Sequence, residues 1–200
     1  MRLFASTLLV AALTSFGTLA QTTLAPPESA EPKAGAPANT ARSSLEDLFE
    51  RLAKATDETE AQGIAKLIER RWSRSGSDTA DLLMSRATEA MQRKDYPLAV
   101  ELLDRVLVLQ PDWAEAWYRR ANVFYLLDDP VSAMADIREV VQREPRHFGA
   151  WTGLGHIFMA SDDKTRALEA YRRALKIYPQ LSTVQTLVDR LAPQVDGLDL

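Results

Sequence analysis

The sequence predicts an all-α solenoid of three helix-turn-helix repeats, with a divergent helical pair before them and a capping helix after them. Two observations carry this fold class. From Leu45 onward, apolar residues recur every three or four positions, and no stretch of useful length alternates with the period of two that a β-strand needs. Beyond Ser77, similar residues also recur 34 positions apart, as expected when one helical unit is stacked on the next.

The first 20 residues have the layout of a secretory signal peptide. One basic residue, Arg2, precedes an apolar run from Leu3 to Leu13, and Thr18 and Ala20 are suitably placed before a cleavage site. The run is too short and too soon followed by polar residues to be a convincing membrane span. We therefore expect cleavage after Ala20 and a periplasmic or secreted chain, which would meet a membrane only through an uncleaved signal peptide.

Residues 21–42 are expected to form a disordered linker. They are rich in Ala, Pro, Thr and Ser and contain almost no large apolar side chains, so they cannot bury enough surface to offset the entropy of ordering. A divergent helical pair follows over residues 43–76, with two apolar stripes at helical spacing. The stripes are Leu45, Leu48, Phe49 and Leu52, and then Ile64, Leu67, Ile68 and Trp72.

The helical pair also carries a start signal for its second helix. Asp57 can act as the N-cap, and Glu60 stands three residues further on, where it can close a capping box. Ala65 lies one period before Ala99, which favours a divergent fourth hairpin. The sequence leaves open whether this pair stacks on the repeats or docks elsewhere.

Five columns of similar residues define the repeats. A proline stops a helix, an Asp caps the next one, and small residues let two helix backbones approach closely. The columns are Pro111, Pro145 and Pro179, then Ala99, Ala133 and Ala167, then Leu83, Trp117 and Trp151, then Ala87, Ala121 and Gly155, and finally Asp95, Asp129 and Asp163 at the turn inside each unit.

The 34-residue unit resembles the tetratricopeptide repeat, whose pattern reads Trp-x2-Leu-Gly-x2-Tyr, then Ala-x3-Phe, then Pro. The units are residues 80–113, 114–147 and 148–181, within a domain over residues 77–200. The third unit matches throughout, at Trp151, Leu154, Gly155, Phe158, Ala167, Tyr171 and Pro179. The second has Trp117, Ala121, Phe124, Ala133, Ile137 and Pro145, and the weaker first has Leu83, Ala87, Ala90, Ala99, Leu103 and Pro111. The chain also looks like small exported bacterial proteins of this class, which have no assigned activity.

A final helix over residues 182–192 is expected to cap the array. The last repeat would otherwise expose the apolar side of its second helix. Val184, Leu187, Val188 and Leu191 lie at helical spacing, and Pro193 is expected to end the helix.

The Gly-x-Gly within Trp151–Phe158 is interpreted as part of a helix. No strand precedes it and no phosphate-binding Lys follows it, which argues against a phosphate loop. Gly155 shares a column with two alanines, so we expect it to be a packing glycine. Gly149 and Gly153 lie four apart on one helix face. Either they leave a shallow trough beside an aromatic and amide wall, or they are tolerated near the start of a helix.

The resemblance implies that the first helix of each unit lines a concave groove. It places there Asp81, Met84, Thr88 and Met91, then Glu115, Tyr118, Asn122 and Tyr125, then Gly149, Thr152, His156 and Met159. The implied function is a protein- or peptide-binding scaffold or adaptor whose partner the sequence does not identify. The expected contacts are Tyr118, Arg119, Asn122, Tyr125, Thr152 and His156.

The resemblance does not extend to binding of chaperone tails. Some relatives clamp the acidic tails of heat-shock chaperones with groove lysines and asparagines. The corresponding lysine positions here hold Met84, Tyr118 and Thr152, so that clamp is not expected.

Composition argues against other classes of function. Twenty-four Lys and Arg stand against 28 Asp and Glu, so the chain lacks the basic footprint of a nucleic-acid-binding protein. Without cysteine, it has no thiol catalysis, thiolate metal site or disulfide. His147 and His156 do not have the spacing of a zinc helix, and we interpret His147 as a turn residue. We therefore expect no enzyme activity, no metal and no cofactor.

Several alternatives stay open. The chain could be an accessory or degraded cell-wall hydrolase domain, or a structural solenoid that self-associates through its edge, and we expect a monomer or weak self-association. Arg86 and Arg120 stand where the family expects leucine, and they either hold nearby carboxylates or reach the carboxylate of a ligand. His156 either contacts a ligand in the groove or is satisfied by a neighbouring helix.

Overall fold

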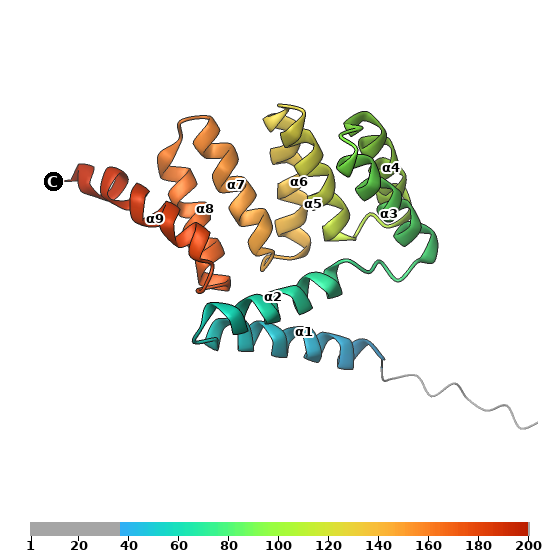
Figure 1. Cartoon of the computed structure of the whole chain (residues 1–200), viewed down its shortest axis with the longest axis horizontal. Helices are drawn as coiled ribbons and strands as arrows, with labels where there is room; N and C mark the ends of the chain where they lie inside the picture. The colour runs from blue at the N-terminus through green and yellow to red at the C-terminus, as the bar shows by residue number, and fades with distance from the viewer. Residues whose placement is uncertain (1–36, 200) are drawn as a thin grey trace, which may run out of the picture. The chain divides into compact units, whose positions relative to one another are not determined.

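The computed structural model describes residues 37–199 of the chain, and Figure 1 shows their arrangement. Within this span every regular element is helical, which confirms the all-α prediction. The elements are α1 (Pro37–Lys54), α2 (Glu58–Trp72), α3 (Asp78–Gln92), α4 (Tyr96–Leu109), α5 (Ala114–Leu126), α6 (Pro130–Arg143), α7 (Phe148–Ala160), α8 (Lys164–Ile177), α9 (Ser182–Val195) and a 3₁₀ helix, η1 (Asp196–Asp199). In the part of the chain described, no helix combines the length and the apolar character needed to cross a membrane.

The linker prediction is wrong at its end, because α1 begins at Pro37 and therefore includes residues 37–42. Proline suits the first turn of a helix, where its missing N–H would have no intrahelical partner. Two alanines within this stretch also favour helix. The rest of the predicted linker, residues 21–36, and the predicted signal peptide lie outside the described residues.

The three repeats are formed by α3 with α4, α5 with α6, and α7 with α8, which stand side by side in Figure 1. Each pair turns through one residue with a left-handed backbone, and these are Lys94, Asp128 and Asp162, with φ of 61°, 59° and 56°. The Asp that follows caps the second helix of each unit, as predicted. Asp95, Asp129 and Asp163 accept the backbone N–H of the residue three positions on, at 3.3, 3.0 and 2.9 Å.

The other columns also have their predicted roles. The second helix of each unit ends two residues before the column proline. The column alanines Ala99, Ala133 and Ala167 are buried. In the helical pair, Asp57 caps α2 by accepting the backbone N–H of Glu60 at 2.9 Å.

Trp117 and Trp151 make equivalent hydrogen bonds, as stacked units require. The indole Nε1 of each donates to the carbonyl oxygen of the proline six residues earlier, at 2.8 Å for Trp117 and 2.9 Å for Trp151. An arginine guanidinium lies over each ring. Arg143 is 5.1 Å from the ring centroid of Trp117, and Arg173 is 4.7 Å from that of Trp151.

Gly155 is a packing glycine inside α7, as predicted. A Cβ atom on Gly155 would lie 2.5 Å from Cδ1 and 2.7 Å from Cζ of Tyr171 in α8, and closer still to Cε1. Carbon atoms normally pack at about 3.5–4.0 Å. Only a residue without a side chain therefore lets the buried Tyr171 ring approach α7 this closely.

Arg120 is held by two carboxylates, which confirms one of the two interpretations of this position. Its Nε and Nη2 donate to Asp136 at 2.8 Å, and its Nη1 donates to Asp104 at 2.6 Å. The hydrogen bonds to Asp136 raise the pKa of Arg120. Asp136 is only 4% exposed, so Arg120 serves as its counter-ion. Arg86 instead lies exposed on α3.

The capping helix α9 covers the last repeat, but it is longer than predicted. Val184, Val188 and Leu191 are buried against α8. The helix continues past Pro193 to Val195, so the predicted end at residue 192 is too early. Proline removes one hydrogen bond and crowds the carbonyl four residues earlier, but Val195 packs against the same apolar cluster, which favours one more turn.

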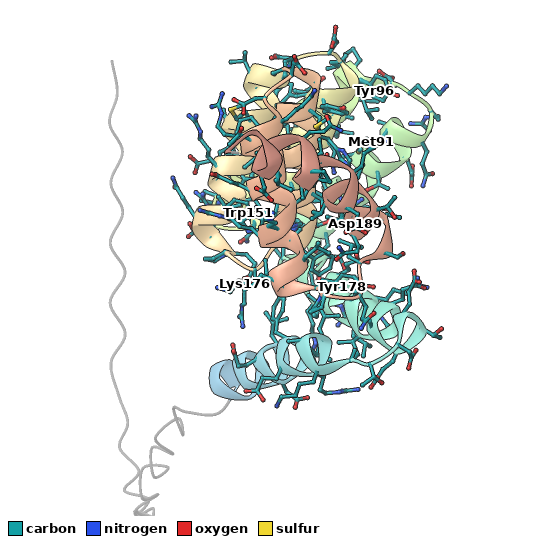
Figure 2. All side chains as sticks on the ribbon, turned by 90° about the vertical axis from the view of Figure 1, so that its left-hand side faces the viewer. Met91, Tyr96, Trp151, Lys176, Tyr178 and Asp189 are labelled. Atoms are coloured by element: carbon teal, nitrogen blue, oxygen red, sulfur yellow. The ribbon has the colours of Figure 1, made fainter. Side chains whose placement is uncertain are left out.

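Helices α1 and α2, here called the N-terminal arm, do not stack on α3, so the fourth-hairpin interpretation is wrong. Their buried residues share one apolar cluster with Phe148 at the start of α7 and Tyr178 after α8. Trp113, just before α5, donates its Nε1–H to the carbonyl oxygen of Trp72 at 2.6 Å. Figure 1 shows α2 running across the ends of the repeat helices, and Figure 2 shows Tyr178 on the side of the repeats that meets the arm.

The arm docks there because the repeats present a strip of residues that needs cover. The N-cap residues of α5, α7 and α9 are Trp113, His147 and Leu181, which lie 34 positions apart. Stacking brings them into one line along the edge of the array. A fourth unit stacked on α3 would leave this line open to water, whereas the apolar stripe of α2 covers it.

Candidate functional site

A pocket of about 320 Å³ lies between the first helices of the second and third repeats and the start of α9. We call it the groove pocket. Five of the six predicted contact residues line it, namely Tyr118, Asn122, Tyr125, Thr152 and His156. Its apolar lining comes from Ala121, Ile137, Phe148, Ile157, Leu181 and Val184. The structure therefore brings together side chains from α5 and α7 on the face that the resemblance assigns to the groove.

Arg119, the sixth predicted residue, does not line the groove pocket. It lies beside α2 in a separate shallow depression with Lys66, Glu69 and Arg70. Its Nε donates to Glu115 at 2.6 Å. Successive residues of a helix point about 100° apart, so Arg119 cannot share the direction of its neighbour Tyr118.

Gly149 and Gly153 both line the groove pocket, but for different reasons. A Cβ on Gly149 would lie 2.8 Å from the hydroxyl oxygen of Tyr118, so the missing side chain makes room for that ring. A Cβ on Gly153 would meet only Cδ1 of Ile137, at an ordinary 3.5 Å. Gly153 is therefore not needed for internal packing, and its small size widens the pocket, as the trough interpretation expects.

Tyr118 forms a fixed wall of the pocket. Its ring centroid is 4.4 Å from that of His147. Burial raises the pKa of Tyr118, and its hydrogen bond with Asn122 opposes this shift. Tyr125, one turn further along the same face than Asn122, is 46% exposed and so is free to meet a ligand.

His147 has a larger structural role than sequence reasoning assigned to it. It precedes α7 as predicted, yet it is only 2% exposed. Its Nδ1 accepts the backbone N–H of Ala150 at 3.0 Å, so the ring proton lies on Nε2, which faces Glu115 Oε2 at 3.3 Å. Its ring stacks on Trp72 of α2, with centroids 4.3 Å apart. His147 thus connects the N-terminal arm to the Tyr118 wall.

A sequence signal for this role existed. His147 lies 34 residues from both Trp113 and Leu181, so it belongs to a repeat column that is mostly apolar. A column of that kind before α5, α7 and α9 predicts a covered edge. The turn interpretation rested on the position of His147 between Pro145 and the next helix.

His156 lies at the edge of the pocket and is partly satisfied by a neighbouring helix, so both interpretations of it have geometric support. The hydroxyl of Tyr171 lies 2.9 Å from its Nδ1. Burial raises the pKa of Tyr171 to about 12, so its hydroxyl keeps its proton at neutral pH and can donate. Burial lowers the pKa of His156, which favours the neutral ring and leaves an Nε2–H available.

The groove pocket has no charged lining residue. Its walls are apolar, hydroxyl, amide and imidazole groups only. Such a surface offers no pair of carboxylates for acid–base catalysis. Among residues 45–197, no three His, Cys, Asp or Glu side chains are grouped closely enough to hold a metal ion.

Comparison with known proteins agrees with the repeat geometry. A tetratricopeptide repeat profile matches residues 84–143 and 132–182. A TPR repeat-containing protein of Rhizobium etli is 39% identical over 153 residues, which cover 76% of this chain and 75% of that protein.

Solved structures with under a quarter of their residues identical share the fold. The first TPR domain of Spaghetti (RPAP3), bound to the HSP90 peptide SRMEEVD, has a TM-score of 0.57 and 17% identity, over 60% of this chain and 95% of that one. The TPR2B domain of yeast Sti1, in a complex with pHsp70, has a TM-score of 0.54 and 19% identity, over 59% of this chain and 99% of that one.

Proposed function

The chain belongs to the tetratricopeptide repeat family, and we propose that it is a scaffold or adaptor that binds a peptide or protein partner in the groove pocket. The observation that carries this proposal is the convergence of Tyr118, Asn122, Tyr125, Thr152 and His156 on one pocket. Two similar folds are known with bound partners, the HSP90 peptide and pHsp70. Pockets that bind small ligands and side chains combine an apolar lining with a few placed polar groups, as this one does.

The proposed activity is binding without catalysis. The pocket contains one imidazole and no carboxylate or amine, so it lacks the paired carboxylates that many hydrolases use as acid and base. Specificity would then come from shape and from the hydrogen-bonding groups of Asn122, Thr152 and His156.

We also propose that the chain acts in the periplasm after cleavage behind Ala20. The basis is the sequence of residues 1–20, with one arginine, an apolar run and small residues before the cut. Intact mass measurement of the protein from a periplasmic extract of its own host tests this. A mature chain that begins at Gln21 agrees with the proposal, and a chain retained in the cytoplasm with its first residues contradicts it.

The scaffold proposal is tested by partner capture with matched variants. Tyr118 packs on His147 and next to Gly149, so its removal would disturb the fold. Asn122→Ala/Tyr125→Ala instead removes two groove side chains that are not part of the buried core. The matched control is Val108→Ala/Val131→Ala, at positions that are 82% and 78% exposed outside the pocket. A partner retained by the control and lost by the groove variant supports the proposal. A partner retained by both would move the binding surface away from the pocket.

The alternative of self-association through the outer face of α3 has less support. The exposed residues of α3 include one large apolar side chain, Leu82, which is 55% exposed. Arg86 and Glu89 lie on the same exposed part of the helix. This face is therefore largely polar, and size-exclusion chromatography at several concentrations should give a constant elution volume.

A further inference from the structure

The chemistry of the groove pocket also indicates what kind of peptide it accepts, an inference that rests on the function proposed above. The HSP90 peptide bound by the similar Spaghetti domain, SRMEEVD, carries three acidic side chains. A groove that binds such a peptide needs cations within reach. The walls of the groove pocket here provide none.

The two arginines of α5 that stand next to lining residues are already paired with carboxylates. Arg119 donates to Glu115, and it lines a different depression beside α2. Arg120 donates to Asp104 and Asp136. A carboxylate entering the pocket would lose hydration and gain no counter-ion, which is strongly unfavourable.

The polar groups of the pocket suit an uncharged peptide backbone. The Asn122 amide can both donate and accept, and the Nε2–H of His156 can donate. The Thr152 hydroxyl donates to the carbonyl oxygen of Phe148 at 2.9 Å, so its oxygen still can accept. These groups stand around an apolar floor that includes Ile137 and Ile157.

The size of the pocket limits what it can take. Ligand pockets usually span about 300–1,000 Å³, and the groove pocket, at about 320 Å³, is at the small end of this range. It can accept one large side chain with the adjoining backbone. We infer that the occupant is an uncharged, extended peptide segment that inserts one large apolar side chain, such as Leu, Met or Phe, beside Gly153.

Selection from a random linear dodecapeptide library displayed on phage, with the full chain as bait, tests this inference. The enriched peptides should share a large apolar residue and should lack Asp and Glu around it. Binding of the enriched synthetic peptides, measured by fluorescence anisotropy, should change less than about twofold between roughly 50 and 500 mM NaCl, because no ion pair is screened. SRMEEVD should bind at least about tenfold more weakly, since its carboxylates meet no cation.

Gly153→Leu is the matching variant, because its side chain would enter the pocket from a position with space around it. It should weaken the enriched peptides at least about tenfold, since the apolar side chain loses its site. Gly63→Leu is the control, since Gly63 is also helical and a Cβ there has no neighbour within 4 Å. This control should bind as the unchanged chain does.

Each other outcome overturns a stated part of the argument. Acidic peptides with salt-sensitive binding that Gly153→Leu abolishes would refute the inference and leave the pocket as the binding site. Peptides that bind both glycine variants equally would refute the pocket itself, and with it the proposed function. Enriched peptides that share no apolar residue would refute the claim that the pocket binds one large apolar side chain.

Discussion

Replacing Gly155 with alanine tests the close approach of α7 and α8, which depends on one missing side chain. The added Cβ would lie 2.5 Å from Cδ1 of Tyr171, and the normal separation of about 3.5–4.0 Å requires a shift of roughly 1 Å. Tyr171 is fully buried, so the ring has nowhere to move without disturbing its neighbours. Overpacking of this kind costs about 1–3 kcal/mol.

Two smaller contributions, a weakened hydrogen bond and a higher helix propensity, change the expected loss of stability. Displacing Tyr171 lengthens its hydrogen bond to His156, a loss of about 0.5–1.5 kcal/mol. Alanine is a better helix former than glycine, which adds about 1 kcal/mol to the free energy of unfolding. We therefore expect Gly155→Ala to lower the free energy of unfolding by roughly 1–3 kcal/mol, measured by urea unfolding followed by circular dichroism.

Gly153→Ala is the control on the same helix, because its Cβ would meet only an ordinary contact at 3.5 Å. It should raise the free energy of unfolding by up to about 1 kcal/mol. Adding Tyr171→Leu to Gly155→Ala should recover part of the loss, since the smaller side chain relieves the overlap. If Gly155→Ala is as stable as Gly153→Ala, the close approach of the two helices is refuted.

Three further predictions concern the arm, the Arg120 ion pairs and alkaline pH. Trp72→Ala removes the ring that packs against the loop before α7 and should cost about 3–5 kcal/mol. Hydrogen exchange should then rise first in α1 and α2, and an equal rise in all helices would argue against a separately docked arm. Arg120→Leu leaves the buried Asp136 carboxylate without its counter-ion and should cost about 3–5 kcal/mol in urea unfolding. Arg86→Leu, at an exposed position, should cost under about 0.5 kcal/mol, and similar costs for the two variants would refute the assigned role. Because burial raises the pKa of Tyr171 from 10.0 to about 12, the folded state disfavours its ionised form. This contribution to stability is full below pH 10 and is lost as the pH rises toward 12. The decrease in melting temperature over this range should be smaller in Tyr171→Phe, and an unchanged decrease would contradict the assignment.

The repeat architecture was predictable because each column residue acts on its immediate surroundings. Asp95 and Asp163 cap helices that begin next to them, and Gly155 accommodates a ring from the paired helix. Such local roles recur every 34 residues, so the repeat period is enough to predict them. The ends of α1 and α9 were less predictable, because proline is compatible with a first turn and also with a last one.

The docking of the arm could not be derived from its own residues. The stripe that ends at Trp72 fits any apolar surface, and its spacing says nothing about which one. Ala65 favoured a fourth stacked unit because it continues a repeat column. The column of Trp113, His147 and Leu181 was the better guide, since it marks the edge that α2 covers.

The groove pocket was predictable to the level of helix faces. Tyr118, Asn122 and Tyr125 share a face by their spacing, and the resemblance supplied its direction. Arg119 was assigned to the groove by its chemistry, although its position one residue after Tyr118 turns it toward α2. The sequence also did not predict that the pocket is uncharged. Glu115 and Arg119 lie close in sequence to the lining residues, and only the structure shows that they pair outside the pocket.

Site-specific photo-crosslinking tests most directly whether partners bind at the groove pocket. A benzophenone amino acid placed at Tyr125, which is 46% exposed at the pocket, should capture the partner when the full chain is irradiated in its host. The same amino acid at Val131, which is 78% exposed and outside the pocket, should capture none. Adducts at Val131 without adducts at Tyr125 would place the binding surface elsewhere and contradict the proposed function.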